Sequence, residues 1–287
     1  MTKRPRLVVI TGATRGLGRH ITDRFLKTGD NLVLIARTGP DLDSVAAACS
    51  QGGRFGSRVH CFPADLSDPA IVPGLVAAVR AQAGDPDILI NNAAVQGPVG
   101  PLVQNDWEEW QQCVNVCLLS PVRLCREFLP AMIGKRFGRI VNISGGGATS
   151  PRPYFTSYAT AKAGLVRFSE TLAGEVAGRG VTVNCVAPGV MNSALTRHIL
   201  CAGEACAGSM EFARARDLMQ DDLHNEERAA DLVHFLTTDA CRHVNGKLIS
   251  AVWDSWETLP AMTPSALAGD VYTLRRVVPE SREEGKR

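Results

Sequence analysis

Residues 8–29 read VVITGATRGLGRHITDRFLKTG, and this stretch decides the fold. A short β-branched run ends just before Gly12. Two more glycines, Gly16 and Gly18, come after it, and a helical pattern then begins. Glycine lets the backbone turn sharply and approach a phosphate closely, and the start of a helix offers free N–H groups to an anion. The order of strand, glycine turn and helix predicts a dinucleotide-binding loop rather than an ordinary strand-to-helix turn.

The same alternation continues along the whole chain. Short, nearly continuous apolar runs occur at 6–11, 31–36, 58–62, 87–92, 138–144, 181–188 and 247–252. Segments long enough for helices lie between them, at 17–29, 41–51, 68–83, 106–134, 156–178 and 226–238. Continuous apolar runs suit parallel strands that are covered on both faces. The pattern therefore predicts an α/β fold, a single Rossmann-type doubly wound parallel sheet of about seven strands with helices on both faces.

Two regions depart from this rhythm. Residues 191–224 lie between a strand and a helix, and we expect them to form a partly helical excursion. Residues 253–287 follow the last strand and hold enough aromatic and apolar side chains to predict a packed extension. We therefore expect one dinucleotide-binding and catalytic domain over residues 1–252, with residues 253–287 as a C-terminal extension of the same domain.

The bulk composition excludes several classes of protein. The 287 residues are 45% apolar and 21% charged, with a net charge of +2, which argues against disorder and against strong attraction to nucleic acid or an anionic membrane. The nine cysteines include no CxxC pair, and Cys113 and Cys117 have no neighbouring ligands that would complete a metal set. No apolar stretch is long enough to span a bilayer. We expect a cytoplasmic protein with no metal, nucleic-acid or membrane partner.

A second stretch, NISGGGATSPRPYFTSYATAKAG at 142–164, carries a candidate catalytic pair. Tyr158 and Lys162 are one helical turn apart, so both side chains can point into one site. Reducing a carbonyl needs a proton for its oxygen, and a phenol with an ordinary pKa of about 10 exchanges protons poorly near neutrality. A lysine ammonium, together with an oxidised nicotinamide, favours the phenolate and lowers that pKa. The small residues around the pair predict a helix packed close to the sheet rather than a solvated surface pair.

Five motifs along the chain resemble those of the short-chain dehydrogenase/reductase family. They are TGATRGLG (11–18), NNAA (91–94), Asn115 within CVNVCLLSP, YATAK (158–162) and APGVMNS (187–193). The resemblance covers about residues 6–252, and five motifs in the right order make it specific for the family, though not for a substrate. It implies a nicotinamide cofactor, a mobile lid at about 190–224, and a homodimer or homotetramer formed through the helices at 106–134 and 156–178.

The resemblance also implies roles for single residues. Tyr158 gives the proton, Lys162 binds the nicotinamide ribose, and Asn115 holds a water in a proton relay toward that lysine. Asp65 matches an adenine-contacting aspartate, although by itself it is equally suited to cap the helix that follows. Ser193 stands where the family has a threonine that holds the nicotinamide amide, and it keeps the hydroxyl. The full set expected to bind the cofactor is Gly12, Thr14, Arg15, Gly16, Leu17, Gly18, Arg37, Asp65, Leu66, Asn92, Ala93, Tyr158, Lys162, Pro188, Gly189 and Ser193.

The end of the second predicted strand decides between NAD(H) and NADP(H). An acidic residue there would bind the adenosine ribose hydroxyls of NAD, but this strand ends with Ala36, and Arg37 follows. Arg15 lies in the glycine loop, and guanidinium groups suit the geometry of phosphate. Unless both arginines are merely solvated surface charges, they predict recognition of a 2′-phosphate, and therefore NADP(H) as the cofactor.

The family's catalytic group also includes a serine that hydrogen-bonds the substrate oxygen. At the family spacing, thirteen residues before Tyr158, stands Gly145, and Ser144 is one residue early. A one-residue shift along a strand turns a side chain to the opposite face. Either the hydroxyl is absent, or the glycine run lets Ser144 swing in, or the substrate is oriented by its own polar groups or by the C-terminal extension. Other hydroxyls that could substitute are those of Thr149, Ser150 and Ser157. We favour Ser144, which gives a catalytic set of Tyr158, Lys162, Asn115 and Ser144.

These observations predict an NADPH-dependent oxidoreductase, a ketoreductase that transfers a hydride between the nicotinamide and a carbonyl or alcohol of a small metabolite. Two alternatives remain: an epimerase or dehydrogenase that handles a sugar or cyclitol in the same site, and a catalytically weak NADP(H)-binding sensor, which only Gly145 supports. Ligands of open parallel sheets lie beyond the carboxyl ends of the strands. We therefore expect the substrate against residues 93–105, 145–157 and 190–224, where Arg197 and His198 could meet a polar or anionic group.

Overall fold

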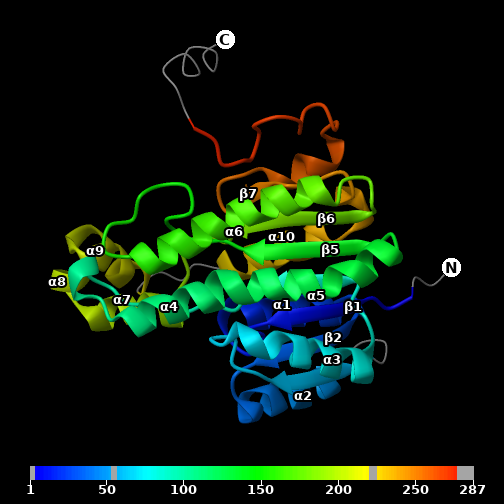
Figure 1. Cartoon of the computed structure of the whole chain (residues 1–287), viewed down its shortest axis with the longest axis horizontal. Helices are drawn as coiled ribbons and strands as arrows, with labels where there is room; N and C mark the ends of the chain where they lie inside the picture. The colour runs from blue at the N-terminus through cyan, green and yellow to red at the C-terminus, as the bar shows by residue number, and fades with distance from the viewer. Residues whose placement is uncertain (1–3, 53–56, 220–224, 277–287) are drawn as a thin grey trace.

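The computed structural model describes residues 4–52, 57–219 and 225–276, which form a sheet covered by helices on both faces (Figure 1). Within these ranges the sheet has seven strands in the order β3-β2-β1-β4-β5-β6-β7, and every neighbouring pair is parallel. The strands are β1 (Leu7–Thr11), β2 (Asn31–Ala36), β3 (Val59–Pro63), β4 (Ile88–Asn91), β5 (Gly138–Ile143), β6 (Val181–Ala187) and β7 (Leu248–Ser250). The predicted doubly wound sheet is confirmed, and its strand order reverses between β1 and β4, where such folds hold their ligands.

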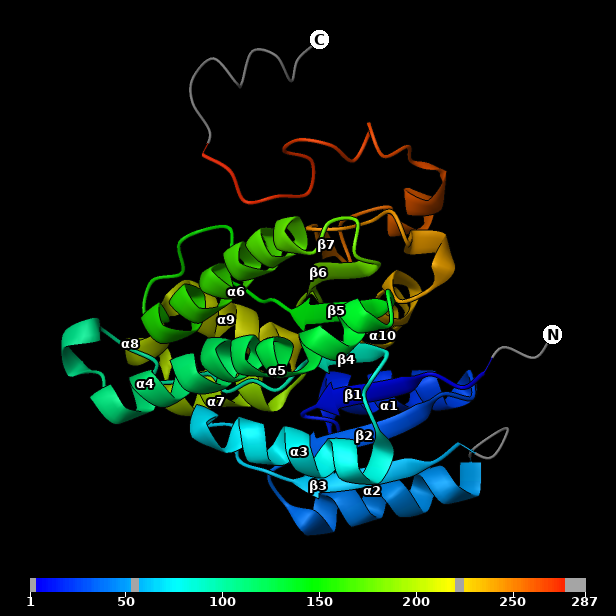
Figure 2. The same ribbon diagram turned by 45° about the vertical axis from the view of Figure 1, so that its right-hand side comes forward.

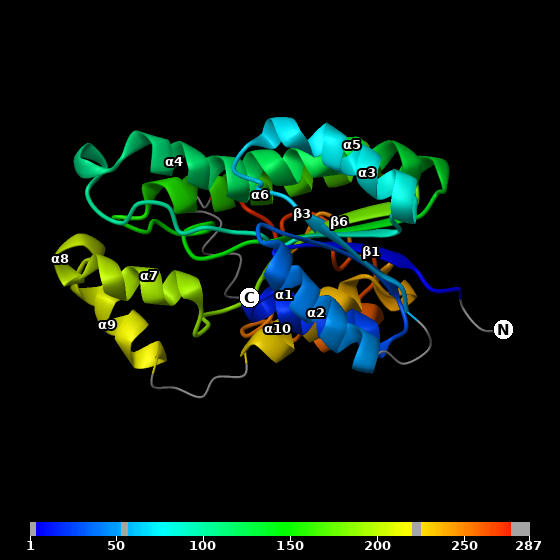
Figure 3. The same cartoon turned by 90° about the horizontal axis from the view of Figure 1, so that it is seen from below.

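Two helical layers cover the sheet, as Figures 2 and 3 show from two further directions. The helices are α1 (Gly16–Lys27), α2 (Gly39–Gly52), α3 (Val72–Ala83), α4 (Trp107–Val114), α5 (Ser120–Gly134), α6 (Thr156–Glu175), α7 (Ala194–Ala202), α8 (Glu204–Ala207), α9 (Ser209–Leu218) and α10 (Asn225–Leu236). Val8 and Ile10 of β1 join the core under α1, α2 and α10, whereas Leu7 and Val9 join the core under α3, α5 and α6. Because successive side chains of a strand point to opposite faces, a continuous apolar run fills both cores. None of the described helices is long and apolar enough to span a membrane.

The helical segment predicted at 106–134 consists of three pieces. α4 begins after Asp106, whose carboxylate accepts a hydrogen bond from the Glu109 N–H at 2.8 Å. A π-helical turn, η4 (Asn115–Leu119), then separates α4 from α5, and the Ser120 N–H bonds to the Asn115 carbonyl. Turns of this kind are frequent at functional sites. Here η4 packs against α6, the helix that carries the tyrosine and lysine of the predicted catalytic pair.

The chain after β7 folds back onto its own sheet edge. The Leu248 N–H donates to the Tyr272 carbonyl at 2.8 Å, and the Ser250 N–H donates to the Asp254 carboxylate at 2.6 Å. Unpaired N–H groups on an edge strand invite pairing with another chain. These two groups of β7 are instead occupied by the extension that follows the strand.

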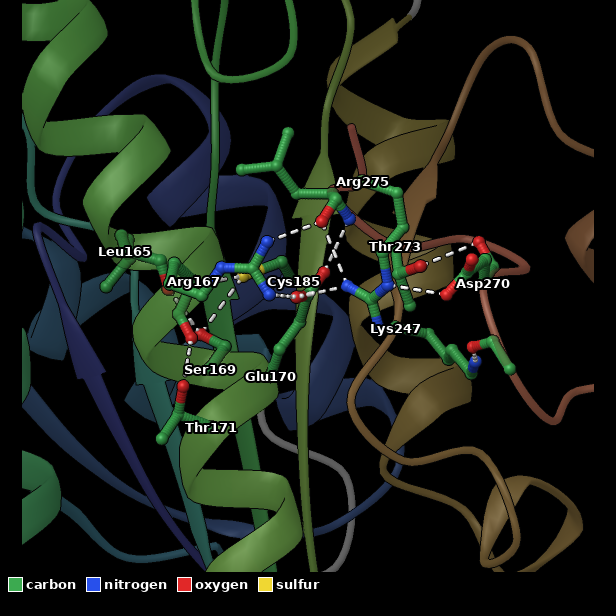
Figure 4. Close-up of polar contacts among 12 residues, drawn as sticks. Leu165, Arg167, Ser169, Glu170, Thr171, Cys185, Lys247, Asp270, Thr273 and Arg275 are labelled. Atoms are coloured by element: carbon green, nitrogen blue, oxygen red, sulfur yellow. Dashed lines mark hydrogen bonds and ion pairs between the residues drawn. The ribbon is translucent and has the colours of Figure 1, made fainter. Parts of the chain in front are cut away.

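A group of charged side chains fastens this extension to α6 (Figure 4). The Glu170 carboxylate accepts from the Leu274 N–H at 2.6 Å and from the Arg275 guanidinium at 3.0 Å. Arg275 also pairs with Asp270 at 2.5 Å, and the Lys247 ammonium donates to the Val271 carbonyl at 2.8 Å. The described part of the extension, up to residue 276, therefore packs on α6 and β7 of the same chain. Residues 277–287 lie outside the described ranges.

Candidate active site

A cavity of about 520 Å³ opens at the carboxyl ends of the strands, where the fold predicts a ligand. The predicted site residues that line it are Gly12, Thr14, Arg15, Gly16, Leu17, Gly18, Arg37, Asp65, Leu66, Asn92, Ala93, Ser144, Tyr158, Lys162, Pro188 and Ser193. Asn115 and Gly189 do not line it, and Gly189, with φ of +87°, lies against Val252 instead. Residues that lie more than 140 positions apart in the sequence are thus brought to one cavity.

The glycine turn after β1 leaves no room for a side chain at Gly12 or Gly18. Gly12 has a φ of +65°, and a Cβ on it would lie 2.9 Å from the Ala93 Cα. A Cβ on Gly18 would collide with the Gly12 carbonyl oxygen. The Asn92 side-chain amide closes the turn by donating to the carbonyls of Thr11 and Gly12 at 3.0 and 3.1 Å. The backbone of the turn and the start of α1 therefore face the cavity directly, which is what close approach to a pyrophosphate requires.

The adenosine end of the cavity carries two arginines beside the carboxylates of Asp41 and Asp65. β2 ends with the half-buried Ala36, and the exposed Arg37 and Arg15 both line the cavity. Neither guanidinium forms an ion pair with another described residue. Two free guanidinium groups and no carboxylate at the end of β2 fit a 2′-phosphate, because Arg binds phosphate through parallel N–H groups.

Three of the predicted residues are held by contacts that the sequence did not reveal. Asp65 lines the cavity and closes its own turn, because its Oδ1 accepts from the Ser67 N–H at 2.9 Å. The Asn115 amide points elsewhere and donates to the Ser67 carbonyl at 2.8 Å, so its role in a water relay stays a prediction. Ser193 is the N-cap of α7 and accepts from the Thr196 N–H at 3.4 Å.

Tyr158 and Lys162 lie together on the buried face of α6 and line the cavity. Their exposed fractions are 6% and 2%. The Lys162 Nζ donates to the Ile143 carbonyl, at the end of β5, at 2.7 Å and lies 5.5 Å from the centre of the Tyr158 ring. The lysine is therefore fixed between the sheet and the phenol. From this position its positive charge can stabilise the ionised form of the phenol.

Burial and charge act on the pKa of this pair in opposite directions. Burial raises the pKa of Tyr158 above its ordinary value, and the positive charge of Lys162 opposes this shift without cancelling it. In the protein without a nicotinamide, removal of the phenol from water therefore outweighs the effect of one neighbouring ammonium. The expected lowering of the phenol pKa, which requires both Lys162 and an oxidised nicotinamide, stays a prediction. Burial disfavours the charge on Lys162, yet the adjacent Tyr158 and Cys117 raise the pKa of that lysine.

Position 145 faces the phenol directly. A Cβ on Gly145 would lie 2.5 Å from the Tyr158 hydroxyl oxygen, so the family's serine position is here occupied by backbone and phenol alone. Ser144 continues β5, with its N–H bonded to the Val186 carbonyl at 2.8 Å. Its hydroxyl is buried, belongs to a residue that lines the cavity, and meets no partner among the described residues.

The other candidate hydroxyls lie outside the cavity. Thr149 and Ser150 are exposed, whereas Ser157 is fully buried beneath Gly97. Sequence reasoning missed Gln96, which is 3% exposed and lines the cavity. Its one signal is its place directly after NNAAV, inside the expected substrate loop 93–105. Further lining residues on this side are Gln112, Met191, Asn192, Leu195, Arg197 and His198.

A salt bridge between residues that do not line the cavity connects the loop after β5 to α9. The Arg152 guanidinium pairs with the Glu211 carboxylate at 2.6 Å and lies 3.9 Å from the centre of the Phe155 ring. Phe155 in turn packs with apolar residues of α7, α8 and α9, namely Ile199, Ala207 and Ala215. Residues 220–224 of the predicted lid lie outside the described ranges.

A glycine turn for a pyrophosphate, a basic ribose end and a buried tyrosine–lysine pair on one parallel sheet define a nicotinamide-dependent oxidoreductase. The sequence pattern of the family described as short chain dehydrogenase matches residues 6–201, and the chain belongs to that family.

Relatives and solved structures agree with this assignment. The 3-oxoacyl-[acyl-carrier-protein] reductase FabG of Escherichia coli is 31% identical over 244 residues, which cover 85% of this chain and 94% of the relative. The D-beta-hydroxybutyrate dehydrogenase of Rhizobium meliloti is 31% identical over 259 residues, or 85% of this chain and 96% of the relative. L-Sorbose reductase from Gluconobacter frateurii, solved with NADPH and L-sorbose, superposes with a TM-score of 0.74 at 28% identity, covering 86% of this chain and 94% of its own. The chain is an NADP(H)-dependent oxidoreductase that acts on a carbonyl group.

Proposed function

We propose that the protein reduces a ketone of a small metabolite, with Tyr158 as the proton donor. The observation that carries this proposal is the buried pair of Tyr158 and Lys162 on the cavity wall, with the phenol directly over Gly145. NADPH, when bound along the glycine turn, supplies the hydride to the carbonyl carbon. The phenol gives its proton to the carbonyl oxygen, and the buried ammonium of Lys162 stabilises the phenolate that remains.

The remaining site residues support this step in different ways. The basic pair Arg15 and Arg37 holds the 2′-phosphate, and the Gly12 turn holds the pyrophosphate. Ser144 is proposed to donate a hydrogen bond to the substrate oxygen, because its buried hydroxyl has no partner within the described chain. Asn115 ties the π turn to the loop that carries Asp65, and we retain it as a member of the proton relay.

A sensor function is the second candidate, because Gly145 removes the hydroxyl that the family places against the phenol. One lost donor of this kind costs about 3–4 kcal/mol of barrier when nothing replaces it. That loss slows a reaction by two to three orders of magnitude without abolishing it. The buried, paired Tyr158 favours the enzyme, since a binding protein has no use for a phenol held beside an ammonium.

The deciding experiment measures NADPH oxidation by the wild type and by Tyr158→Phe over a panel of ketones, quinones, keto sugars and β-keto esters. We expect wild-type turnover that falls by at least a hundredfold in the variant, with the dissociation constant for NADPH nearly unchanged. Equal rates in both proteins would remove Tyr158 from the mechanism. Tight NADPH binding without turnover on any compound would favour the sensor.

We also propose that the chain acts as a cytoplasmic homo-oligomer, a homodimer or homotetramer. Support comes from exposed apolar side chains gathered on η3 (Leu102–Gln104), α4 and η4: Leu102, Val103, Trp107 and Leu119. Val103 is 93% exposed, which suits a residue that a second copy covers. Light scattering after gel filtration gives the mass directly, and a Val103→Glu variant that becomes monomeric would place the contact.

A further inference from the structure

Three consecutive glycines, at positions 145–147, form a turn that lies against the Tyr158 hydroxyl. A Cβ on Gly145 would lie 2.5 Å from the phenol oxygen, and the Ala148 N–H donates to the Gly145 carbonyl at 3.3 Å. Gly147 has a φ of +90°, a conformation that residues with a side chain rarely adopt. Glycine loses more conformational freedom on ordering than any other residue, so a turn of three glycines is intrinsically loose. Neighbouring side chains must therefore hold it against the phenol.

Arg152 is one side chain that does so. A Cβ on Gly147 would lie 3.3 Å from the Arg152 Cβ, and a Cβ on Gly146 would lie 3.6 Å from the Arg152 Nη1. The same Cβ on Gly147 would collide with Ala159 of α6, so the turn is in contact with both that helix and the arginine. Neither Arg152 nor these two glycines line the cavity, and the arginine therefore supports the turn from outside the site.

The guanidinium of Arg152 is itself held in place by two groups. Its Nε and Nη2 donate to the Glu211 Oε2 of α9 at 3.0 and 2.6 Å, and it lies 3.9 Å from the centre of the Phe155 ring. The side chains of Arg152 and Glu211 are only 15% and 17% exposed, so solvent ions screen this pair weakly. The positive charge of Arg152 is therefore fixed in position beside the glycine turn.

This fixed charge acts on the proton donor. Burial raises the pKa of Tyr158 most strongly, Lys162 lowers that pKa, the thiols of Cys117 and Cys113 raise it, and Arg152 lowers it. Lys162 acts from α6 and the thiols act from η4 and α4, whereas Arg152 acts from the loop after β5. Two cations thus oppose the effect of burial on the phenol, and of these two only Lys162 lines the cavity.

We propose that Arg152 is a positioning residue for the proton donor Tyr158. It holds the glycine turn against the phenol hydroxyl and adds a positive charge that favours release of the phenol proton, and Glu211 anchors it. Gly145 makes this arrangement possible, because a Cβ there would push the turn and the phenol apart. The inference rests on the proposed role of Tyr158 in ketone reduction. Its consequence is that a carboxylate of α9 affects the reacting group, although no residue of α9 lines the cavity.

The test titrates the Tyr158 phenol in protein saturated with NADP⁺. Because the chain has three tyrosines, the phenolate absorbance of each protein is compared with that of the same protein carrying Tyr158→Phe. The variants are Arg152→Met, which removes the charge, Arg152→Lys, which keeps it, and Glu211→Gln, which removes the opposing carboxylate. The matched control is Arg228→Met on α10, because Arg228 also pairs with a glutamate, Glu257 at 3.0 Å, and lies 5.3 Å from the centre of an aromatic ring.

We expect the midpoint of the titration to rise by about 0.5–1 pH unit in Arg152→Met, because one favourable charge is lost. The midpoint should fall in Glu211→Gln, where the guanidinium is no longer neutralised, and stay close to the wild-type value in Arg152→Lys and Arg228→Met. An unchanged midpoint in Arg152→Met, or shifts of the same sign in Arg152→Met and Glu211→Gln, overturns the proposal whatever happens to stability. If Arg152→Met does not fold, a midpoint that fails to fall in Glu211→Gln overturns it.

Steady-state kinetics give a second readout. We expect kcat for ketone reduction to fall by about three- to tenfold in Arg152→Met and to recover in Arg152→Lys, with the dissociation constant for NADPH unchanged. A kcat that Arg152→Lys fails to recover overturns the proposal, because shape rather than charge would then matter. The titration needs no ketone, so it judges Arg152 separately from the proposed function. Activity that survives Tyr158→Phe would remove that function and leave the titration result as it stands.

Discussion

The cavity has a dinucleotide half, beside the glycine turn after β1, and a substrate half, beside Tyr158 and Ser144. The polar groups of the two halves differ in whether they find hydrogen-bond partners within the protein. In the dinucleotide half, the Thr11 hydroxyl accepts from the N–H groups of Asn92 and Ala93 at 3.0 Å each, and the Asn92 amide closes the glycine turn. In the substrate half, the Ser144 hydroxyl and the Gln96 Nε2 are buried and meet no partner in the part of the chain that the structure describes. In the dinucleotide half, the hydrogen bonds within the protein hold the backbone in a fixed position for a single ligand, the cofactor. A half that leaves donors unpaired depends on its substrate to complete them.

The largest effect is expected where the dinucleotide half is most crowded. Gly18→Ala places a methyl group against the Gly12 carbonyl oxygen, so the turn must open. We expect NADPH binding to weaken by at least a hundredfold and the free energy of unfolding to fall by about 1–3 kcal/mol. Fluorescence titration and thermal melting measure the two quantities. The matched control is Gly174→Ala on α6, where a Cβ meets open space; normal binding by Gly18→Ala would refute the crowded-turn interpretation.

The charge at the ribose end sets cofactor choice in the same half. Arg37→Glu replaces a guanidinium at the end of β2 with the carboxylate that NAD-binding strands carry there. Loss of one charge-assisted hydrogen bond to the 2′-phosphate is worth about 1.5–3 kcal/mol. We expect the ratio of kcat/KM for NADPH over NADH to fall by about 10- to 100-fold. An unchanged ratio would mean that Arg37 is only a solvated surface charge.

In the substrate half, restoring the family's hydroxyl should harm rather than help. The Cβ of Gly145→Ser would lie 2.5 Å from the Tyr158 oxygen, so the phenol must move. Displacing a reacting group by about an ångström costs on the order of a hundredfold in rate, and we expect a loss of about tenfold in kcat because the added hydroxyl recovers part of it. Steady-state kinetics with Gly145→Ala as the volume control decides the matter. A faster Gly145→Ser enzyme would show that the phenol yields easily and that the site lacks only the hydroxyl.

Tyr158 lies where the substrate half meets the dinucleotide half, so the pKa of its phenol reports on both. Burial raises its pKa while Lys162 opposes the rise, so the phenol stays protonated through neutral pH and ionises above the ordinary value of about 10. Reduction therefore loses its proton donor only as pH rises through this raised pKa. The chain has three tyrosines, so the phenolate absorbance of wild type minus that of Tyr158→Phe isolates this group. A midpoint below 10 without cofactor would contradict the shift, and we expect saturation with NADP⁺ to lower the midpoint, because a second positive charge then faces the phenol.

Periodicity and local motifs were enough to predict the fold, because parallel strands covered on both faces leave continuous apolar runs. The glycine turn and the Tyr158–Lys162 pair were predictable for a similar reason, since each lies within one short stretch of sequence. The raised pKa of Tyr158 was not predictable, because it follows from burial among distant segments. The unpaired amide of Gln96 also could not be read from the sequence. Its environment depends on Cys113, Cys117 and Ser157, which reach it only through the packing of α4 and α6.

We expect the smallest effect from a substitution that loosens the C-terminal extension. This substitution is also a control for the comparison of the two cavity halves. The Glu170 side chain is 8% exposed, and its carboxylate accepts from the Leu274 N–H and from Arg275. Glu170→Gln keeps the shape but weakens these two hydrogen bonds and a third from Arg167, and none of these residues lines the cavity. We expect a loss of about 1–2 kcal/mol in the free energy of unfolding, measured by denaturant titration, with the affinities for NADPH and for the ketone unchanged. Weaker binding of NADPH or of the ketone would show that the extension is coupled to the cavity. The difference between the two cavity halves would then depend on more than the residues that line them.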